Sequence, residues 1–129
     1  MKSPEPYREE RPWGAFIEFT RNAQSTVKII TVNPNESLSL QYHHNRDEFW
    51  HVISGEGILE IGTDKKRAVI GADYFVPKGT RHRISAGNLP LALLEISYGA
   101  FDENDIVRLE DKYGRIGSTE KKDPAPEAK

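Results

Sequence analysis

Short runs of alternating or β-branched apolar residues dominate the chain between Pro12 and Gly117. The run TVKIITV (Thr26–Val32) ends at a turn, Asn33-Pro34-Asn35, and in Leu38–His43 polar and apolar side chains alternate strictly. Further strands are expected at Glu48–Ser54, Ile58–Gly62, Arg67–Gly71, Asp73–Pro77, Arg81–Ser85 and Leu91–Ser97. Many short strands separated by Gly, Pro and Asn predict an all-β sandwich or barrel.

One segment departs from this pattern, and both ends of the chain differ from the middle. Asp102–Asp111 has apolar residues at helical spacing and Asp102 as a potential cap, which predicts one short C-terminal helix. Residues 1–11 and 118–129 are polar and contain prolines, so they cannot bury much apolar surface. We therefore expect a flexible arm at 1–11, a domain at 12–117 and a disordered tail at 118–129.

Composition narrows the classes of partner and of site. The chain has 129 residues, the length of one ordinary domain, and its net charge of −2 creates no field that would attract nucleic acid or an anionic membrane. It contains no cysteine, which excludes disulfides and thiolate metal sites. The N-terminal residues lack the apolar run of a signal peptide. A cytoplasmic protein without nucleic-acid or membrane partners is expected.

Residues able to bind a metal concentrate in the stretch from Gln41 to Glu48. Gln41 and His43 are two residues apart in an expected strand, so they project to the same side. Glu48 opens the next strand, and His82 follows a turn after another strand. In a closed barrel, Gln41, His43, Glu48 and His82 can converge on one divalent metal ion. This sulfur-free set suits zinc, our first expectation, and also manganese, iron, cobalt or nickel.

Simpler structural roles compete with this interpretation. His43 and His82 can each be interior histidines that form hydrogen bonds with the backbone. A buried Gln41 can simply form hydrogen bonds with its neighbours. His51 alternates away from Glu48, which favours a structural role. The aromatic residues are interpreted as core and strand-packing residues: Trp13, Phe49, Trp50 and Phe75.

The spacing of these residues resembles the two sequence motifs of the cupin superfamily, which implies a jelly-roll β-barrel. The first motif, G(x)5HxH(x)4E(x)6G, is matched at Asn35, Gln41, His43, Glu48 and Gly55, with Asn and Gln replacing the first Gly and His. The second, G(x)5PxG(x)2H(x)3N, is matched at Gly71, Pro77, Gly79 and His82, with Ala86 replacing the last residue. Asn tolerates the left-handed backbone conformation, so the substitution at residue 35 is mild.

A finer resemblance is to type II phosphomannose isomerases. RPWG, SLSLQYHHNRDEFWHVISGEG, VPKGTRHRI and DIVRLEDKYGR are similar to the isomerase domain that often follows a mannose-1-phosphate guanylyltransferase domain. Glutamine in place of the first motif histidine is itself a feature of these isomerases. The resemblance implies a metal-dependent enzyme that interconverts mannose 6-phosphate and fructose 6-phosphate through an enediolate.

Other residues are assigned provisional roles by this hypothesis. Glu95, His44 and Lys78 are candidates for the catalytic base. Arg81, Arg83 and Arg108, with Lys78, are candidates for binding the sugar phosphate. Cupins also catalyse other reactions, such as epimerisation, lyase action and oxygenation, and a binding module without catalysis is a further alternative. We also expect a homodimer formed through an edge strand at Gly14–Thr20.

Overall fold

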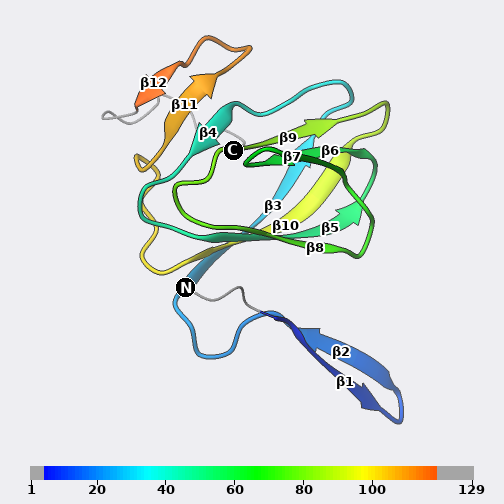
Figure 1. Cartoon of the computed structure of the whole chain (residues 1–129). Coiled ribbons are helices and arrows are strands. Elements are labelled where there is room, and N and C mark those ends of the chain that lie inside the picture. The colour runs from blue at the N-terminus through cyan, green and yellow to red at the C-terminus, as the bar shows by residue number, and fades with distance from the viewer. Residues whose placement is uncertain (1–4, 119–129) are drawn as a thin grey trace.

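The computed structural model describes residues 5–118, and all regular structure within this range is β (Figure 1). The strands are β1 (Tyr7–Arg11), β2 (Gly14–Glu18), β3 (Ser25–Val32), β4 (Leu40–Tyr42), β5 (Glu48–Ser54), β6 (Gly57–Ile61), β7 (Asp64–Arg67), β8 (Asp73–Val76), β9 (His82–Ala86), β10 (Leu91–Tyr98), β11 (Val107–Glu110) and β12 (Gly117–Ser118). The predicted all-β class is confirmed. Within residues 5–118 no helix could cross a membrane.

Two antiparallel sheets enclose the core. One has the order β3-β10-β5-β8 and the other the order β12-β11-β4-β9-β6-β7. Their inner faces bury a single cluster of apolar side chains: Ile30, Val32, Leu38, Trp50, Val52, Leu59, Ala68, Val76, Ile84, Leu91 and Leu93. This cluster fills one part of the interior and leaves the other to polar groups.

The inner face of the four-stranded sheet changes from polar to apolar along its strands. Ser97 on β10 lies opposite Thr26 and Glu48, and the next inward residue, Glu95, lies opposite Lys28 and Trp50. One row further, Leu93 lies opposite Ile30 and Val52, and these three are buried in the core. We call each set of inward residues that lie opposite one another across the strands a row. Because inward residues are spaced by two along a strand, the polar half of the barrel begins one row from the hydrophobic core.

The facing sheet continues this polar half. Arg108 on β11 lies opposite Gln41 on β4, which in turn lies opposite His82 on β9. All three side chains are almost completely buried. The interior between the two sheets therefore has one apolar half and one half rich in ionisable and amide groups.

The predicted helix at Asp102–Asp111 is wrong. Asp102 does cap a structure, but it is a turn, in which its carboxylate accepts from the backbone N–H of Asn104 (2.9 Å). Beyond the turn, β11 pairs with β4, so Ile106 and Arg108 point inward in the alternation of a strand. Tertiary pairing with a neighbouring strand overrides the weak local helical spacing.

Two further sequence-based expectations are corrected. The strand expected at Arg67–Gly71 lies earlier, as β7, because the turn after Ile61 folds the chain back at once onto β6. Trp13 is not a core residue, since it lies in the turn between β1 and β2 with 71% of its surface exposed.

The N-terminal hairpin stands apart from the two sheets. β1 and β2 pair only with each other among the described strands, and the hairpin projects away from the barrel in Figure 1. The described end of the expected N-terminal arm is thus strand β1. Of the expected C-terminal tail, Ser118 ends β12, and residues 119–129 lie outside the described range.

Two connections depend on special backbone conformations. Asn35, which replaces the first glycine of the motif, has a φ of 61°, the left-handed conformation expected for it. Gly55, between β5 and β6, has a φ of 93°, and a Cβ there would lie 1.7 Å from the carbonyl oxygen of Pro90. Only glycine allows these backbones to approach so closely.

Candidate metal centre

His43, Glu48 and His82 come together in the polar half of the barrel. The Nε2 atom of His43 lies 3.3 Å from Oε2 of Glu48, and Nε2 of His82 lies 3.6 Å from Oε1 of the same carboxylate. All three side chains are buried, and one ligand atom from each lies within 4.8 Å of the others. The two imidazole rings are 4.9 Å apart between centroids. This grouping brings three of the four expected ligands close enough together to hold a metal ion.

The protein backbone fixes the orientation of both imidazoles. Nδ1 of His43 lies 2.6 Å from the carbonyl oxygen of Asp105, and Nδ1 of His82 lies 2.8 Å from that of Thr80. A carbonyl can only accept, so each Nδ1 carries a proton, and Nε2 of each ring faces Glu48. Histidines that ligate metals are commonly held by such a bond at the other ring nitrogen.

Burial keeps His43 in the form that binds metals. Desolvation lowers the pKa of His43 from 6.5 to about 3, against the opposing attraction of the Glu48 carboxylate. Its imidazole is therefore neutral at physiological pH. A neutral ring can donate its lone pair to a metal without prior loss of a proton.

Gln41, the fourth expected ligand, is a neighbour of His82 in the sheet. It lies directly opposite His82 across β4 and β9 and is almost completely buried. Its amide oxygen accepts a hydrogen bond from the hydroxyl of Ser39 (3.0 Å). The amide oxygen has a second lone pair, so the bond to Ser39 orients this oxygen without excluding a metal.

Arg46 is a member of this cluster that sequence reasoning missed. Its Nε donates to Oε2 of Glu48 (3.0 Å), and its Nη2 lies 3.3 Å from Nε2 of His43. It also donates to the carbonyl oxygens of Asp102 and Asp105 (3.1 and 3.4 Å). Its position two residues before Glu48 was the available signal, but arginine is so commonly exposed that the pattern did not indicate burial.

The donor set fits a divalent metal ion. Two imidazoles, a carboxylate and an amide oxygen match the ligand preferences of zinc and of related ions without sulfur ligands. One contact must change, because Nη2 of Arg46 bonds to the same lone pair of His43 that a metal would use. Arg46 can keep its bond to Oε2 of Glu48 while Oε1 faces His82.

Comparison with known proteins places this site in a family. The model of the family "Mannose-6-phosphate isomerase C-terminal" matches residues 5–111. The chain belongs to this family. It is 42% identical over 107 residues to the xanthan biosynthesis protein XanB of Xanthomonas campestris, covering 81% of this chain and 23% of XanB. It is 38% identical over 108 residues to the mannose-1-phosphate guanylyltransferase of Escherichia coli K12, covering 82% and 23%. The chain spans about a quarter of the length of these curated relatives.

Solved structures support the cupin fold of this isomerase-family domain. Oxalate decarboxylase from Bacillus subtilis superposes with a TM-score of 0.62 at 20% identity, covering 67% of this chain and 24% of that one. A putative sugar phosphate isomerase from Acidithiobacillus ferrooxidans gives a TM-score of 0.54 at 25% identity, covering 59% and 51%. The predicted cupin barrel is confirmed.

The three candidates for the catalytic base occupy different environments in this isomerase-family domain. Glu95 is buried on the inner face of β10, one row from Glu48. His44 is exposed, and its ring lies edge-on to Tyr42 (5.2 Å). Lys78 is exposed, and its backbone N–H donates to the carboxylate of Asp47 (2.8 Å). Glu95 alone of these three shares the interior with the metal cluster.

The three arginine candidates for substrate binding also lie in different places in the structure. Arg108 is buried in the same row as Gln41 and His82. Arg83 lies on the other side of β9 from His82 and pairs with Glu60 (2.8 Å) and Glu110 (3.1 Å). Arg81 precedes β9 and is exposed. Of the three, the structure brings only Arg108 next to the expected ligands.

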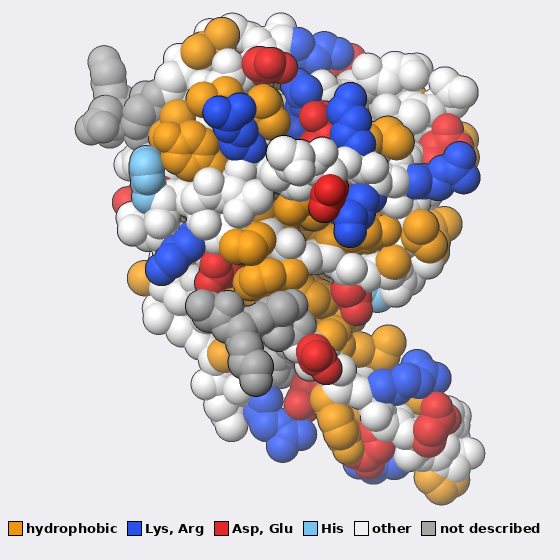
Figure 2. All heavy atoms as spheres, viewed as in Figure 1, with side chains coloured by type: hydrophobic (Ala, Val, Ile, Leu, Met, Phe, Trp, Pro, Cys, Tyr) orange, Lys and Arg blue, Asp and Glu red, His pale blue; other side chains and the backbone are white. Residues whose placement is uncertain are grey.

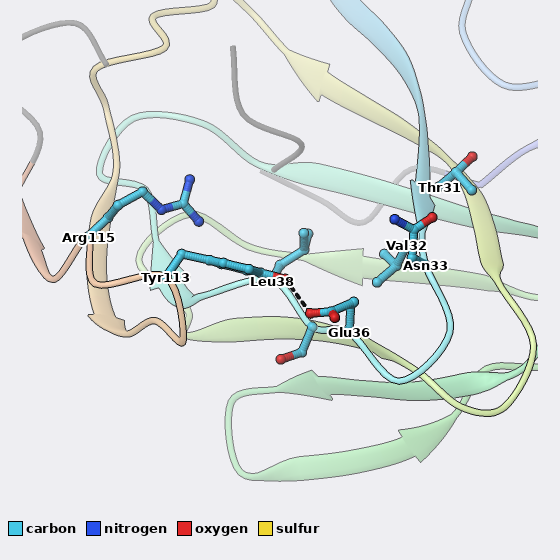
Figure 3. Close-up of a pocket in the computed structure, with 8 residues that line it drawn as sticks. Thr31, Val32, Asn33, Glu36, Leu38, Tyr113 and Arg115 are labelled. Carbon is cyan, nitrogen blue, oxygen red and sulfur yellow. Dashed lines mark hydrogen bonds between the residues drawn. The ribbon is translucent and has the colours of Figure 1, made fainter. Parts of the chain in front are cut away.

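A shallow pocket lies between the end of β3 and the C-terminal segment (Figure 3), with a volume of about 190 Å³. The Tyr113 hydroxyl bonds across it to the carboxylate of Glu36. Arg115 also lines it, and its guanidinium is bound by Asp111 (2.7 Å). Its lining residues include none of the expected metal ligands, so this pocket is separate from the metal centre.

Proposed function

We propose that the chain is a metal-dependent isomerase that interconverts mannose 6-phosphate and fructose 6-phosphate. The observation that carries this proposal is the buried group of His43, Glu48 and His82 in a chain of the mannose-6-phosphate isomerase C-terminal family. His43, Glu48, His82 and Gln41 would hold the ion. When bound, a divalent cation supplies positive charge that stabilises the negative charge developing on an enediolate oxygen.

Glu95 is proposed as the base. Conversion of the aldose into the ketose removes the proton on C2 and delivers a proton to C1, while the proton of the O2 hydroxyl passes to O1. A single carboxylate can take the C2 proton and return it to C1. Glu95 is buried one row from Glu48, which supports this role over the exposed His44 and Lys78.

Arg108 is proposed to bind a substrate oxygen. It lies beside Gln41 in the row that continues to His82, so its guanidinium belongs to the same compartment as the expected ligands. A guanidinium donates several hydrogen bonds in a fixed plane, which suits hydroxyl or phosphate oxygens.

The test is a coupled assay of the purified chain loaded in turn with zinc, manganese, cobalt, nickel and iron(II). Formation of fructose 6-phosphate from mannose 6-phosphate, lost on chelation and restored by metal, is the expected result. Absence of interconversion with every metal, in protein shown by elemental analysis to be loaded, would reject isomerisation.

A non-catalytic sugar-phosphate-binding module is the second candidate. Binding a sugar phosphate needs only the cation site and a basic group such as the buried Arg108, without a catalytic base. Thermal stabilisation of the metal-loaded chain by mannose 6-phosphate without turnover would identify this function.

A further inference from the structure

Lys28 is a basic residue that faces the polar half of the barrel. It lies on β3 in the inward row, directly opposite Glu95 on β10, and its side chain is half-buried. Its ammonium group lies 4.4 Å from the ring centroid of Phe101. Lys28 forms no ion pair within residues 5–118. A cation held inward in this way is available to a negatively charged ligand.

Phe101 connects Lys28 to the metal cluster. The guanidinium of Arg46 lies 4.6 Å from the centroid of the same ring, and Nε of Arg46 bonds to Glu48. Lys28 and Arg46 therefore converge on a single aromatic ring, which attracts both cations electrostatically. The ring places the ammonium group of Lys28 close to the proposed reaction centre although β3 supplies none of the expected metal ligands.

The charge of this compartment favours an anion. Its basic side chains are Lys28, Arg46 and Arg108, and its acidic side chains are Glu48 and Glu95. Basic groups thus exceed acidic groups by one, and a divalent ion would add two further positive charges. In a compartment shielded from water, such an excess is best balanced by a bound anion.

Two buried donors in the same rows also lack partners. The hydroxyl of Ser97, opposite Glu48, and the indole Nε1 of Trp50, opposite Glu95, form no hydrogen bond within residues 5–118. Buried polar groups nearly always find a partner, so unpaired donors here point to a bound polar molecule.

We propose that Lys28 binds the phosphate group of the substrate. This inference rests on the proposed function, in that the ligand is taken to be a sugar phosphate. Arg83 is already neutralised by Glu60 and Glu110, and Arg81 is exposed, so neither offers an inward cation without a partner. Lys28 gains more from a phosphate because it forms no ion pair with the acidic residues between positions 5 and 118.

The experiment measures ligand binding by the metal-loaded chain with calorimetry, using mannose 6-phosphate, inorganic phosphate and mannose as probes. The variants are Lys28→Met, which removes the charge, Lys28→Arg, which keeps it, and Lys66→Met, a control on the exposed strand β7. We expect Lys28→Met to weaken binding of mannose 6-phosphate about tenfold or more and leave the affinity for mannose unchanged. Lys28→Arg should retain most of the affinity, and Lys66→Met all of it.

The outcomes separate this inference from the proposed function. If Lys28→Met and Lys66→Met bind mannose 6-phosphate equally well, or if Lys28→Met weakens mannose and mannose 6-phosphate equally, the role of Lys28 is wrong even in an active isomerase. If binding depends on Lys28 but the unaltered chain shows no turnover, the inference stands and isomerisation fails. If the unaltered chain binds neither phosphate nor mannose 6-phosphate, both are overturned.

Discussion

Nε of Arg46 lies 3.0 Å from Oε2 of Glu48 in the interior of the barrel, where both side chains are almost completely buried. Removing one partner of a buried ion pair leaves the other charge uncompensated. We expect Arg46→Leu to lower the free energy of unfolding of the metal-free chain by about 3 kcal/mol. Zinc should restore part of this loss, because it compensates the Glu48 carboxylate.

Urea denaturation with and without zinc measures this effect. Arg21→Leu is the matched control, because Arg21 forms its ion pair with Glu18 at the surface. If Arg46→Leu and Arg21→Leu are equally stable without metal, the buried pair has no structural importance.

His82→Ala should abolish tight binding of the metal. It removes one of the two imidazoles of the expected set and leaves His43 as its single nitrogen ligand, so zinc is held mainly by weaker oxygen ligands. Elemental analysis after dialysis should give about one zinc ion per chain for the unaltered protein, and close to none for the variant. His51→Ala is the control, because His51 lies on the outer face of β5 and pairs with Asp73 (2.6 Å). Equal zinc content in His82→Ala and His51→Ala would refute the assigned centre.

Gln41→Leu tests whether the amide is a ligand. Leucine keeps the approximate size of the side chain and removes the oxygen, so we expect zinc affinity to fall about tenfold or more while one ion still binds. Competition with a chromophoric chelator measures the change. Unchanged zinc affinity would mean that Gln41 is not a ligand and that its amide oxygen only accepts the hydrogen bond from Ser39.

Glu95→Gln tests the proposed base. The substitution keeps the shape of the side chain but removes its ability to take a proton, so kcat should fall by about 10²- to 10⁴-fold. The zinc content and the KM should change little. Glu60→Gln is the control, because Glu60 pairs with Arg83 away from the metal cluster. Retention of kcat in Glu95→Gln would transfer the role of base to another group.

The N-terminal hairpin leads us to expect a homodimer. An isolated two-stranded hairpin is only marginally stable in water, and here Trp13 in its turn is largely exposed. Among the strands of residues 5–118, β3 is at the edge of its sheet, and its outward residues Val27 and Ile29 are exposed. Figure 2 shows apolar side chains gathered on the barrel surface near the hairpin. The hairpin of a second copy can cover such a surface and edge.

Light scattering coupled to gel filtration tests this expectation. The unaltered chain should elute as a dimer at micromolar concentration, and Ile29→Lys should shift it toward the monomer. Lys66→Met, on the distant β7, should leave the dimer intact. A monomer at all concentrations would remove the expectation.

Much of the fold followed from alternation along the strands. The strand predicted at Glu48–Ser54 coincides with β5. Its apolar run begins after a loop and ends at Gly55, whose positive φ favours glycine. The prediction of a helix at Asp102–Asp111 was wrong because the apolar spacing of this segment is compatible with both a helix and a strand. Pairing with β4, a contact distant in sequence, decided between them.

The site was predictable where motif spacing and strand periodicity agreed. His43, Glu48 and His82 meet as expected, because their spacing places them at the ends of strands in two facing sheets. Arg46 and Lys28 were not found, since a buried arginine and an inward lysine look like surface residues in a sequence. Only the register between β3, β10 and β5 reveals which charges share the interior.

The acceptors that hold the two imidazoles are main-chain carbonyls, at Thr80 and Asp105. Every residue type carries this group, so a mutation that changes the side chain at position 80 preserves the acceptor. Substitutions at position 80 therefore leave the orientation of the His82 ring unchanged. A displacement of the backbone at this position would alter it. Homologues can therefore diverge at this position without altering the reactivity of the centre.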